Sequence, residues 1–191
     1  MIRSRHNYDE IYRDLIWAYG DKPDPELIAA LTDVVRGRAV DIGGGQGRNA
    51  LALAALGFDV AVIDSSSNGL HQAAAEAEQR SLPLHVVQSD LAHYEPEPGL
   101  KAVVGALFFH IPATKTSLKV AECLGEALDP GGVFYVSLPG FTKETVAFVE
   151  QLMETAGCKK DWVVKHLVTK KDRPRLPVAR RNETRALGIK P

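Results

Sequence analysis

The sequence lacks the features of a disulfide-stapled, metal-binding or membrane-spanning protein. It has only two cysteines, Cys123 and Cys158, with no C-x-x-C pair and no histidine at metal-ligand spacing, so we interpret both as packing residues and expect no metal. Its longest apolar runs, such as residues 49–56, are far shorter than the roughly 20 residues that cross a bilayer, so we expect no membrane partner. The first residues offer no apolar signal-peptide core, and we expect a cytoplasmic protein.

What the sequence does contain is the composition of a globular domain. Hydrophobic residues make up 45% and charged residues 25% of the 191 residues, which excludes disorder, collagen and coiled coil. An α/β chain of this length buries roughly 70% of the surface that its unfolded form exposes, which is enough for a stable core without disulfide bonds or bound metal. No internal repeat or low-complexity linker divides the sequence, so we expect a single domain over residues 1–191.

Short apolar runs alternate with helical patterns, which predicts a doubly wound α/β fold with a mostly parallel sheet. Residues 37–158 hold this alternating core. Strands are expected at 38–42, 60–64, 84–87, 102–107 and 133–137, and helices at 48–56, 68–80, 117–127 and 142–156.

The segments that flank this core have patterns of their own. Residues 1–36 predict two helices, an amphipathic one over 8–19 and a second that Asp24 caps. Residues 159–191 predict a basic hairpin, with a strand at 162–169 and a weak one at 184–189. An antiparallel pair here would bring the sheet to seven strands.

The sharpest motif stands between the first strand and the helix that follows it. Asp41-Ile42-Gly43-Gly44-Gly45-Gln46-Gly47 has the spacing D-x-G-x-G-x-G. A dinucleotide fingerprint would need G-x-G-x-x-G, and neither Gly43 nor Gly44 starts one, because Arg48 or Gln46 stands at a required glycine. Glycines here allow a ligand to approach the backbone closely. The preceding acid would repel a pyrophosphate and attract an ammonium group.

With three further segments, this motif resembles class I S-adenosylmethionine-dependent methyltransferases. The segments are Asp64 at the end of the second strand, Ser89-Asp90-Leu91 after the third, and Leu128 to Gly132 before the fifth. More narrowly, Gly45 to Asn49, Tyr19 to Pro23 and Phe109 to Pro112 look like the tellurite-resistance and thiopurine-type small-molecule branch. Ile11 departs from that branch, whose W-D-x-R-Y pattern has arginine at this position.

The resemblance implies a Rossmann-like methyltransferase fold with an N-terminal helical lid, and S-adenosylmethionine as cofactor. It implies that Asp41 and the loop glycines Gly43, Gly44, Gly45 and Gly47 hold the methionine moiety. It also implies that Asp64 accepts both ribose hydroxyls, with Ser65 beside it and Asp90 and Leu91 framing the adenine. From the residues alone, Asp64 and Asp90 also fit helix or loop capping. The four glycines are harder to explain by a tight turn alone.

Two further features concern the methyl acceptor. His110 follows the fourth strand and either orients or deprotonates the acceptor, or bonds to a neighbouring backbone. Tyr12, Trp17 and Tyr19 fit an aromatic lid over the sulfonium, although for Trp17 we prefer ordinary packing. Methyl transfer needs no protein nucleophile, so the lack of a catalytic triad is consistent with a small acceptor, whether a thiol, a selenol or a metalloid oxyanion.

Charge along the chain keeps two alternatives open. Residues 159–191 carry eleven basic and three acidic side chains, a net +8, which leaves −9 for residues 1–158. This segment is either a solvated hairpin or a surface for an anionic partner, including nucleic acid. No N-P-P-Y or D-P-P-Y follows the fourth strand, and Trp162 is the segment's only aromatic residue, so we expect no nucleic-acid partner. The other alternative is a module that binds the cofactor without turnover. The sequence indicates no oligomeric state.

Overall fold

A seven-stranded sheet with helices on both faces forms the core of the computed structural model, which describes residues 8–105, 115–169 and 180–191. The strand order is β3-β2-β1-β4-β5-β7-β6, so the chain starts in the middle of the sheet, extends to one edge and then to the other. The strands are β1 (Arg38–Ile42), β2 (Asp59–Asp64), β3 (His85–Gln88), β4 (Leu100–Gly105), β5 (Leu128–Pro139), β6 (Lys159–Thr169) and β7 (Arg180–Ile189). The predicted Rossmann-like fold is confirmed.

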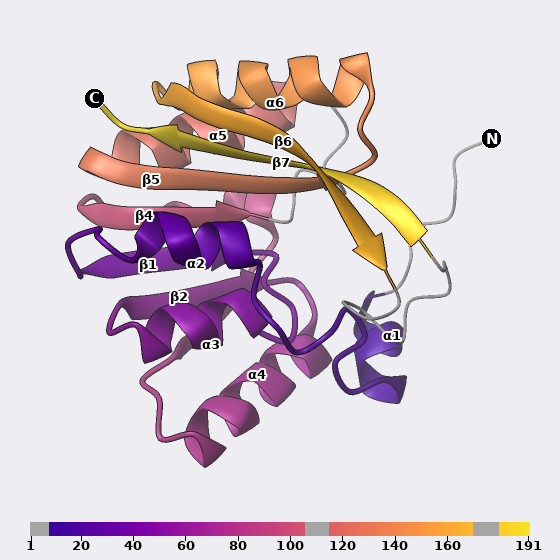
Figure 1. Cartoon of the computed structure of the whole chain (residues 1–191). Helices are drawn as coiled ribbons and strands as arrows, with labels where there is room; N and C mark the ends of the chain where they lie inside the picture. The colour runs from indigo at the N-terminus through magenta and orange to yellow at the C-terminus, as the bar shows by residue number, and fades with distance from the viewer. Residues whose placement is uncertain (1–7, 106–114, 170–179) are drawn as a thin grey trace.

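The first five strands are parallel, and the last two run antiparallel to their neighbours. β1 pairs with β2 and β4, and β5 pairs with β7 through Val133–Ile189 to Pro139–Glu183. β6 pairs only with β7, so it forms the far edge of the sheet (Figure 1). The predicted antiparallel C-terminal pair is therefore present. β7 has ten residues and joins the sheet over its whole length, which corrects the expectation of a weak strand at 184–189.

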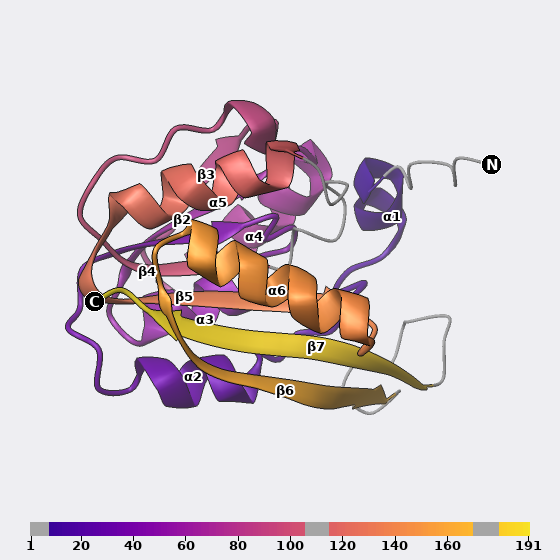
Figure 2. The same cartoon turned by 90° about the horizontal axis from the view of Figure 1, so that it is seen from above.

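An apolar layer of side chains lies between each face of the sheet and the helices that cover it. Figure 2 shows helices on both sides of the sheet. On one face, α2 (Pro25–Leu31), α3 (Arg48–Ala55) and α4 (Ser67–Gln79) contribute side chains such as Leu27, Leu53 and Leu70. On the other face, α5 (Lys115–Ala127) and α6 (Lys143–Thr155) contribute Leu124 and Leu152. Within the described ranges, no helix is long and apolar enough to cross a membrane.

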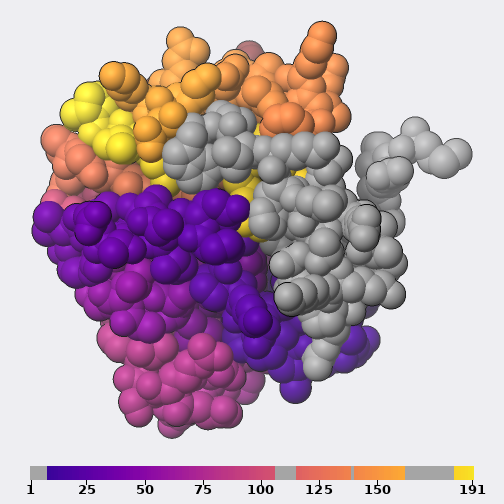
Figure 3. Space-filling model, viewed as in Figure 1, coloured from indigo at the N-terminus to yellow at the C-terminus, as the bar shows by residue number. Residues whose placement is uncertain are grey.

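α1 (Tyr8–Asp14) lies away from these layers, beside the edge where β1, β2 and β4 end (Figure 1). Its main partner is α4, and the chain from α1 to α2 crosses the front face in Figure 3. The helix ends at Asp14 and is thus shorter than the predicted span of 8–19; beyond it the backbone is left-handed at Trp17, with φ of 54°. The N-terminal helix therefore borders the edge at which parallel α/β sheets bind ligands.

Candidate active site

The glycine loop between β1 and α3 is a tight turn fastened to the neighbouring strand. The amides of Gly43 and Gly44 donate to the carbonyl of Ile63 at 2.6 and 3.3 Å, and the amide of Gly47 donates to the carbonyl of Gly44 at 2.8 Å. Gly43, Gly45 and Gly47 have φ values of 61°, 53° and 77°, which strain other residues. The turn therefore requires glycine before any ligand is considered.

Close neighbours impose a second requirement for glycine in the loop. A Cβ atom on Gly44 would lie 2.4 Å from Cγ2 of Val62, and one on Gly45 would lie 2.4 Å from the hydroxyl oxygen of Tyr12. On Gly47 it would lie 2.9 Å from Cβ of Ala73. The protein's own packing thus accounts for much of the glycine pattern, a cause that the sequence analysis did not foresee.

Asp41 lies beneath this loop rather than on its surface. The residue is 2% exposed, and its Oδ2 accepts a hydrogen bond from the amide of Ala50 at 3.0 Å. A Cβ on Gly44 would lie 2.9 Å from its carboxyl group. Burial raises the pKa of Asp41 to about 7, although nearby Arg48 favours the charged form. The structure thus makes Asp41 a support of the loop, and its contact with a methionine moiety stays a prediction.

Asp64 joins the glycine loop to the turn that precedes α4. Its Oδ2 accepts from the amide of Gly45 at 2.9 Å, and its Oδ1 accepts from the amide of Ser66 at 2.8 Å. Burial raises the pKa of Asp64, and these two hydrogen bonds partly oppose the shift. An ionised carboxylate offers about four lone-pair sites, so Asp64 keeps capacity for a further donor. The role of Asp64 toward a ribose stays a prediction that this geometry fits.

The remaining predicted contacts of the adenosyl end lie after β2 and β3. Ser65 is exposed and its carbonyl accepts from Nε2 of Gln88 at 3.2 Å. Asp90 caps the 3-10 turn Leu91–His93, with its Oδ1 accepting from the amide of Ala92 at 3.0 Å. Asp90 thus has the capping role that the sequence left open, while its contact with adenine stays a prediction. His110 lies outside the described residues.

Three tyrosines gather around α1. The rings of Tyr8, Tyr12 and Tyr19 lie with centroids 6.0 to 6.3 Å apart, and Tyr12 is buried against Gly45. The guanidinium carbon of Arg80 lies 6.0 Å from the ring centroid of Trp17, a contact that agrees with a packing role for Trp17. Of the three residues predicted to form a lid, Tyr12 and Tyr19 therefore pack together, with Tyr8 beside them, and their role as a lid stays a prediction.

Two polar residues that the sequence analysis missed tie the N-terminal segment to the site. Asp9 of α1 accepts from Oγ of Ser66 at 2.7 Å and from the amide of Asn68 at 2.9 Å. Gln46, inside the glycine loop, accepts from the amide of Ala18 at 2.7 Å and donates to the carbonyl of Leu15 at 2.8 Å. The sequence contains only two local signals for these links: a glutamine among the loop glycines, and an aspartate within the segment Tyr8 to Tyr12.

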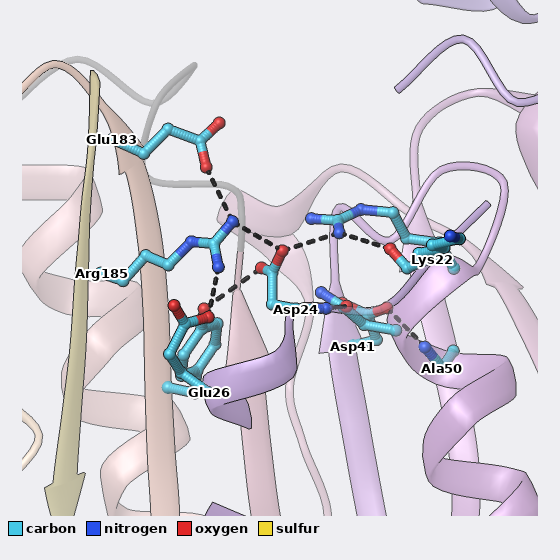
Figure 4. Close-up of polar contacts among 10 residues, drawn as sticks. Lys22, Asp24, Glu26, Asp41, Ala50, Glu183 and Arg185 are labelled. Carbon is cyan, nitrogen blue, oxygen red and sulfur yellow. Dashed lines mark hydrogen bonds and ion pairs between the residues drawn. The ribbon is translucent and has the colours of Figure 1, made fainter. Parts of the chain in front are cut away.

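A buried ion network lies farther along the same edge, between α2 and β7 (Figure 4). The guanidinium of Arg185 is 3.1 Å from Asp24, 3.3 Å from Glu183 and in contact with Glu26. Asp24 also lies 2.7 Å from Arg48, the first residue of α3. The carboxylate of Asp24 makes no capping hydrogen bond to α2, which corrects its predicted role, because both arginines compete for it. This network ties α2, α3 and β7 together.

Comparison with known proteins agrees with this architecture. Residues 39–132 match the family described as methyltransferase domain. The trans-aconitate 2-methyltransferase of Rhodopseudomonas palustris is 31% identical over 121 residues, which cover 62% of this chain and 44% of that protein. The chain therefore spans less than half the length of this curated relative. The resemblance to class I S-adenosylmethionine-dependent methyltransferases is confirmed.

Solved structures share the fold at low sequence identity. A protein solved in work on the conversion of a disulfide bond into a thioacetal group during echinomycin biosynthesis has a TM-score of 0.73 and 18% identity, covering 96% of this chain and 91% of its own. A TehB-like S-adenosylmethionine-dependent methyltransferase from Corynebacterium glutamicum has a TM-score of 0.67 and 19% identity, covering 97% of both chains. These likenesses concern the fold.

Proposed function

We propose that this chain, whose residues 39–132 match the methyltransferase domain family, is a class I S-adenosylmethionine-dependent methyltransferase that transfers a methyl group from that cofactor to a small molecule. The observation that carries the proposal is the position of Asp64, whose oxygens accept from Gly45 and Ser66 at the ends of two neighbouring strands. This buried carboxylate with spare acceptor capacity fits a ribose diol. The match of residues 39–132 to the methyltransferase domain supports the same cofactor.

The residues of the site have roles in binding and orientation. When bound, the cofactor supplies a methyl group already activated on a sulfonium, so the protein needs no nucleophile. The glycine loop brings backbone amides close to the ligand, and Asp41 supports the loop from below. The tyrosines around α1 offer ring faces that favour a cation and exclude water. Alignment and partial desolvation then account for much of the acceleration.

The cofactor assignment is tested by Asp64→Ala. Losing a charged hydrogen-bond acceptor typically costs about 1.5–3 kcal/mol, so we expect cofactor affinity to fall about ten- to a hundredfold in calorimetry. Asp59→Ala, at the exposed start of the same strand, is the matched control and should bind normally. Unchanged affinity in a folded Asp64→Ala variant, or preference of the wild type for NAD, would contradict the proposal.

For the acceptor, we propose a soft nucleophile, namely a thiol, a selenol or a metalloid oxyanion. The neighbour solved in work on a disulfide-to-thioacetal conversion supports sulfur as the acceptor atom. Methyl-labelled cofactor incubated with such acceptors, and with RNA and DNA in parallel, should label the small molecules alone. Labelled nucleic acid would favour the nucleic-acid alternative, and cofactor binding without any turnover would indicate a binding module.

His110 is proposed to face this acceptor. If it contacts only the acceptor, His110→Ala should lower turnover more than it lowers cofactor affinity, because the binary complex lacks that contact. Lost cofactor affinity with normal turnover at saturation would instead show that His110 lines the cofactor site or has a packing role.

A further inference from the structure

The β2–α4 turn, which holds the proposed ribose carboxylate, is itself held by a residue from α1. Oγ of Ser66 accepts from the amide of Gly69 at 3.1 Å, so Ser66 caps α4, and the same oxygen donates to Oδ1 of Asp9 at 2.7 Å. Asp9 also accepts from the amide of Asn68 at 2.9 Å and from Nδ2 of Asn68 at 2.8 Å. A carboxylate from a distant helix thus satisfies the donors at the start of α4.

Ser66 connects this cap to the cofactor site. Its amide donates to Oδ1 of Asp64, whose Oδ2 accepts from the amide of Gly45. An uninterrupted path of hydrogen bonds therefore runs from Asp9 through Ser66 and Asp64 to the glycine loop. Each link is 2.7 to 2.9 Å long, within the range of strong hydrogen bonds.

The same helix reaches the loop by a second route. Tyr12, one turn after Asp9, is buried so closely against Gly45 and Gly69 that a Cβ on either glycine would lie within 2.8 Å of its ring or hydroxyl. Its carbonyl accepts from Nε2 of Gln72 in α4. α1 is thus fixed to both turns that border the site, and Asp9 is its charged contact with the β2–α4 turn.

We propose that Asp9 is a positioning residue for the cofactor. By capping α4 from another helix, it fixes Ser66 and thereby the orientation of Asp64, and it holds in place the three tyrosines around α1. The inference rests on the proposed function. Asp9 acts on Asp64, the predicted ribose contact, only through Ser66. Its loss should therefore lower the affinity for the ligand without changing the methyl-transfer step. The hydrogen bonds from Asn68 and Ser66 hold the pKa of Asp9 below its usual value, which keeps it charged at neutral pH.

The test compares Asp9→Asn with Asp14→Asn, an exposed aspartate at the end of the same helix that pairs only with the adjacent Arg13 among the described residues. Asparagine keeps the shape of Asp9 but loses the charge and one acceptor oxygen. Affinity for S-adenosylhomocysteine should fall about fivefold in Asp9→Asn, as expected when roughly one hydrogen bond is lost, and stay unchanged in Asp14→Asn. KM for the cofactor should rise by the same factor while kcat at saturation stays constant.

Ligand-free hydrogen exchange separates this inference from the proposed function. In Asp9→Asn, the amides of Gly45, Ser66 and Asn68 should exchange faster than in the wild type, whether or not a cofactor binds. Wild type that binds no S-adenosylhomocysteine, together with these faster amides, would overturn the proposed function and leave the hydrogen-bond path standing. Unchanged exchange and unchanged affinity in folded Asp9→Asn would overturn the positioning role.

A second variant covers the case in which Asp9→Asn does not fold. Ser66→Gly removes the hydroxyl that links Asp9 to Asp64, and glycine at an N-cap costs only a few tenths of a kcal/mol relative to serine. It should reproduce the fivefold loss of affinity. A lower melting temperature with normal affinity in this variant would show that the contact is merely structural.

Discussion

The two halves of the ligand edge of the sheet hold their carboxylates in different ways. At β1 and β2, Asp41 and Asp64 accept hydrogen bonds from backbone amides of their own neighbourhood. At β5 and β7, Asp24 and Glu183 face the guanidinium of Arg185, which comes from the far end of the chain. The first arrangement leaves acceptor capacity for a ligand, and the second holds distant segments together. The difference suits binding at one half and cohesion at the other.

Of the changes considered, removing Arg185 should lower the stability of the protein most. Its side chain is 3% exposed and contacts three carboxylates, so its loss removes a buried cation from a cluster of negative charge in which Arg48 still contacts Asp24. Breaking a buried ion pair typically costs about 3–5 kcal/mol, and we expect Arg185→Ala to lower the free energy of unfolding by that amount. Urea denaturation followed by circular dichroism measures it.

The control for this variant is an exposed ion pair. Arg80→Ala removes a surface partner of Glu76 on α4 and should cost less than about 1 kcal/mol. Equal losses in the two variants would mean that the network at β7 contributes no more than a surface pair.

A smaller effect is expected from the ionisation of Asp41. Its pKa of about 7 lies above the ordinary value of 3.8, so the folded protein binds more protons than the unfolded chain between these values. Stability should therefore fall as pH rises from 5 to 7, by up to about 1.4 kcal/mol per pH unit. Asp41→Asn should lose this dependence, because asparagine is neutral but still accepts from the amide of Ala50. Parallel pH profiles of the two proteins would contradict the assignment.

The contrast between local and distant partners also explains which structural features could be predicted from the sequence. β1 was predicted at its observed limits, and the cap of α6 at Thr142 and the left-handed Gly157 after it were also predicted. These features depend on neighbours in sequence, such as glycine at a positive φ or threonine before a helix. The class of fold followed from the alternation of such elements.

Features set by distant partners were not predictable in this way. α1 ends at Asp14 because the carbonyl of Leu15 and the amide of Ala18 bond to Gln46 rather than continuing a helix. β7 reads as weak because Glu183 and Arg185 interrupt its apolar pattern, yet both are buried beside α2. In the candidate site, the glycine motif and the family resemblance indicated the glycines and Asp64, whereas the role of Asp9 required the three-dimensional contact.

The smallest of these expected effects distinguishes two reasons for glycine. Gly45 and Gly131 both have positive φ, of 53° and 76°, so alanine strains either position by about 1–2 kcal/mol. A Cβ at Gly131 meets nothing within 4 Å, whereas one at Gly45 meets the ring of Tyr12. Gly45→Ala should therefore cost about 1–3 kcal/mol more than Gly131→Ala, the usual penalty for overpacking.

A double variant shows whether Tyr12 causes this excess. The hydroxyl oxygen of Tyr12 is the atom nearest to the added methyl group, at 2.4 Å, so Tyr12→Phe should recover part of the stability that Gly45→Ala loses. Denaturation of the wild type, both single variants and the double variant gives the coupling free energy directly. Strictly additive losses of stability would show that Tyr12 of α1 does not clash with a methyl group at position 45. In that case the requirement for glycine at position 45 would come from backbone conformation alone.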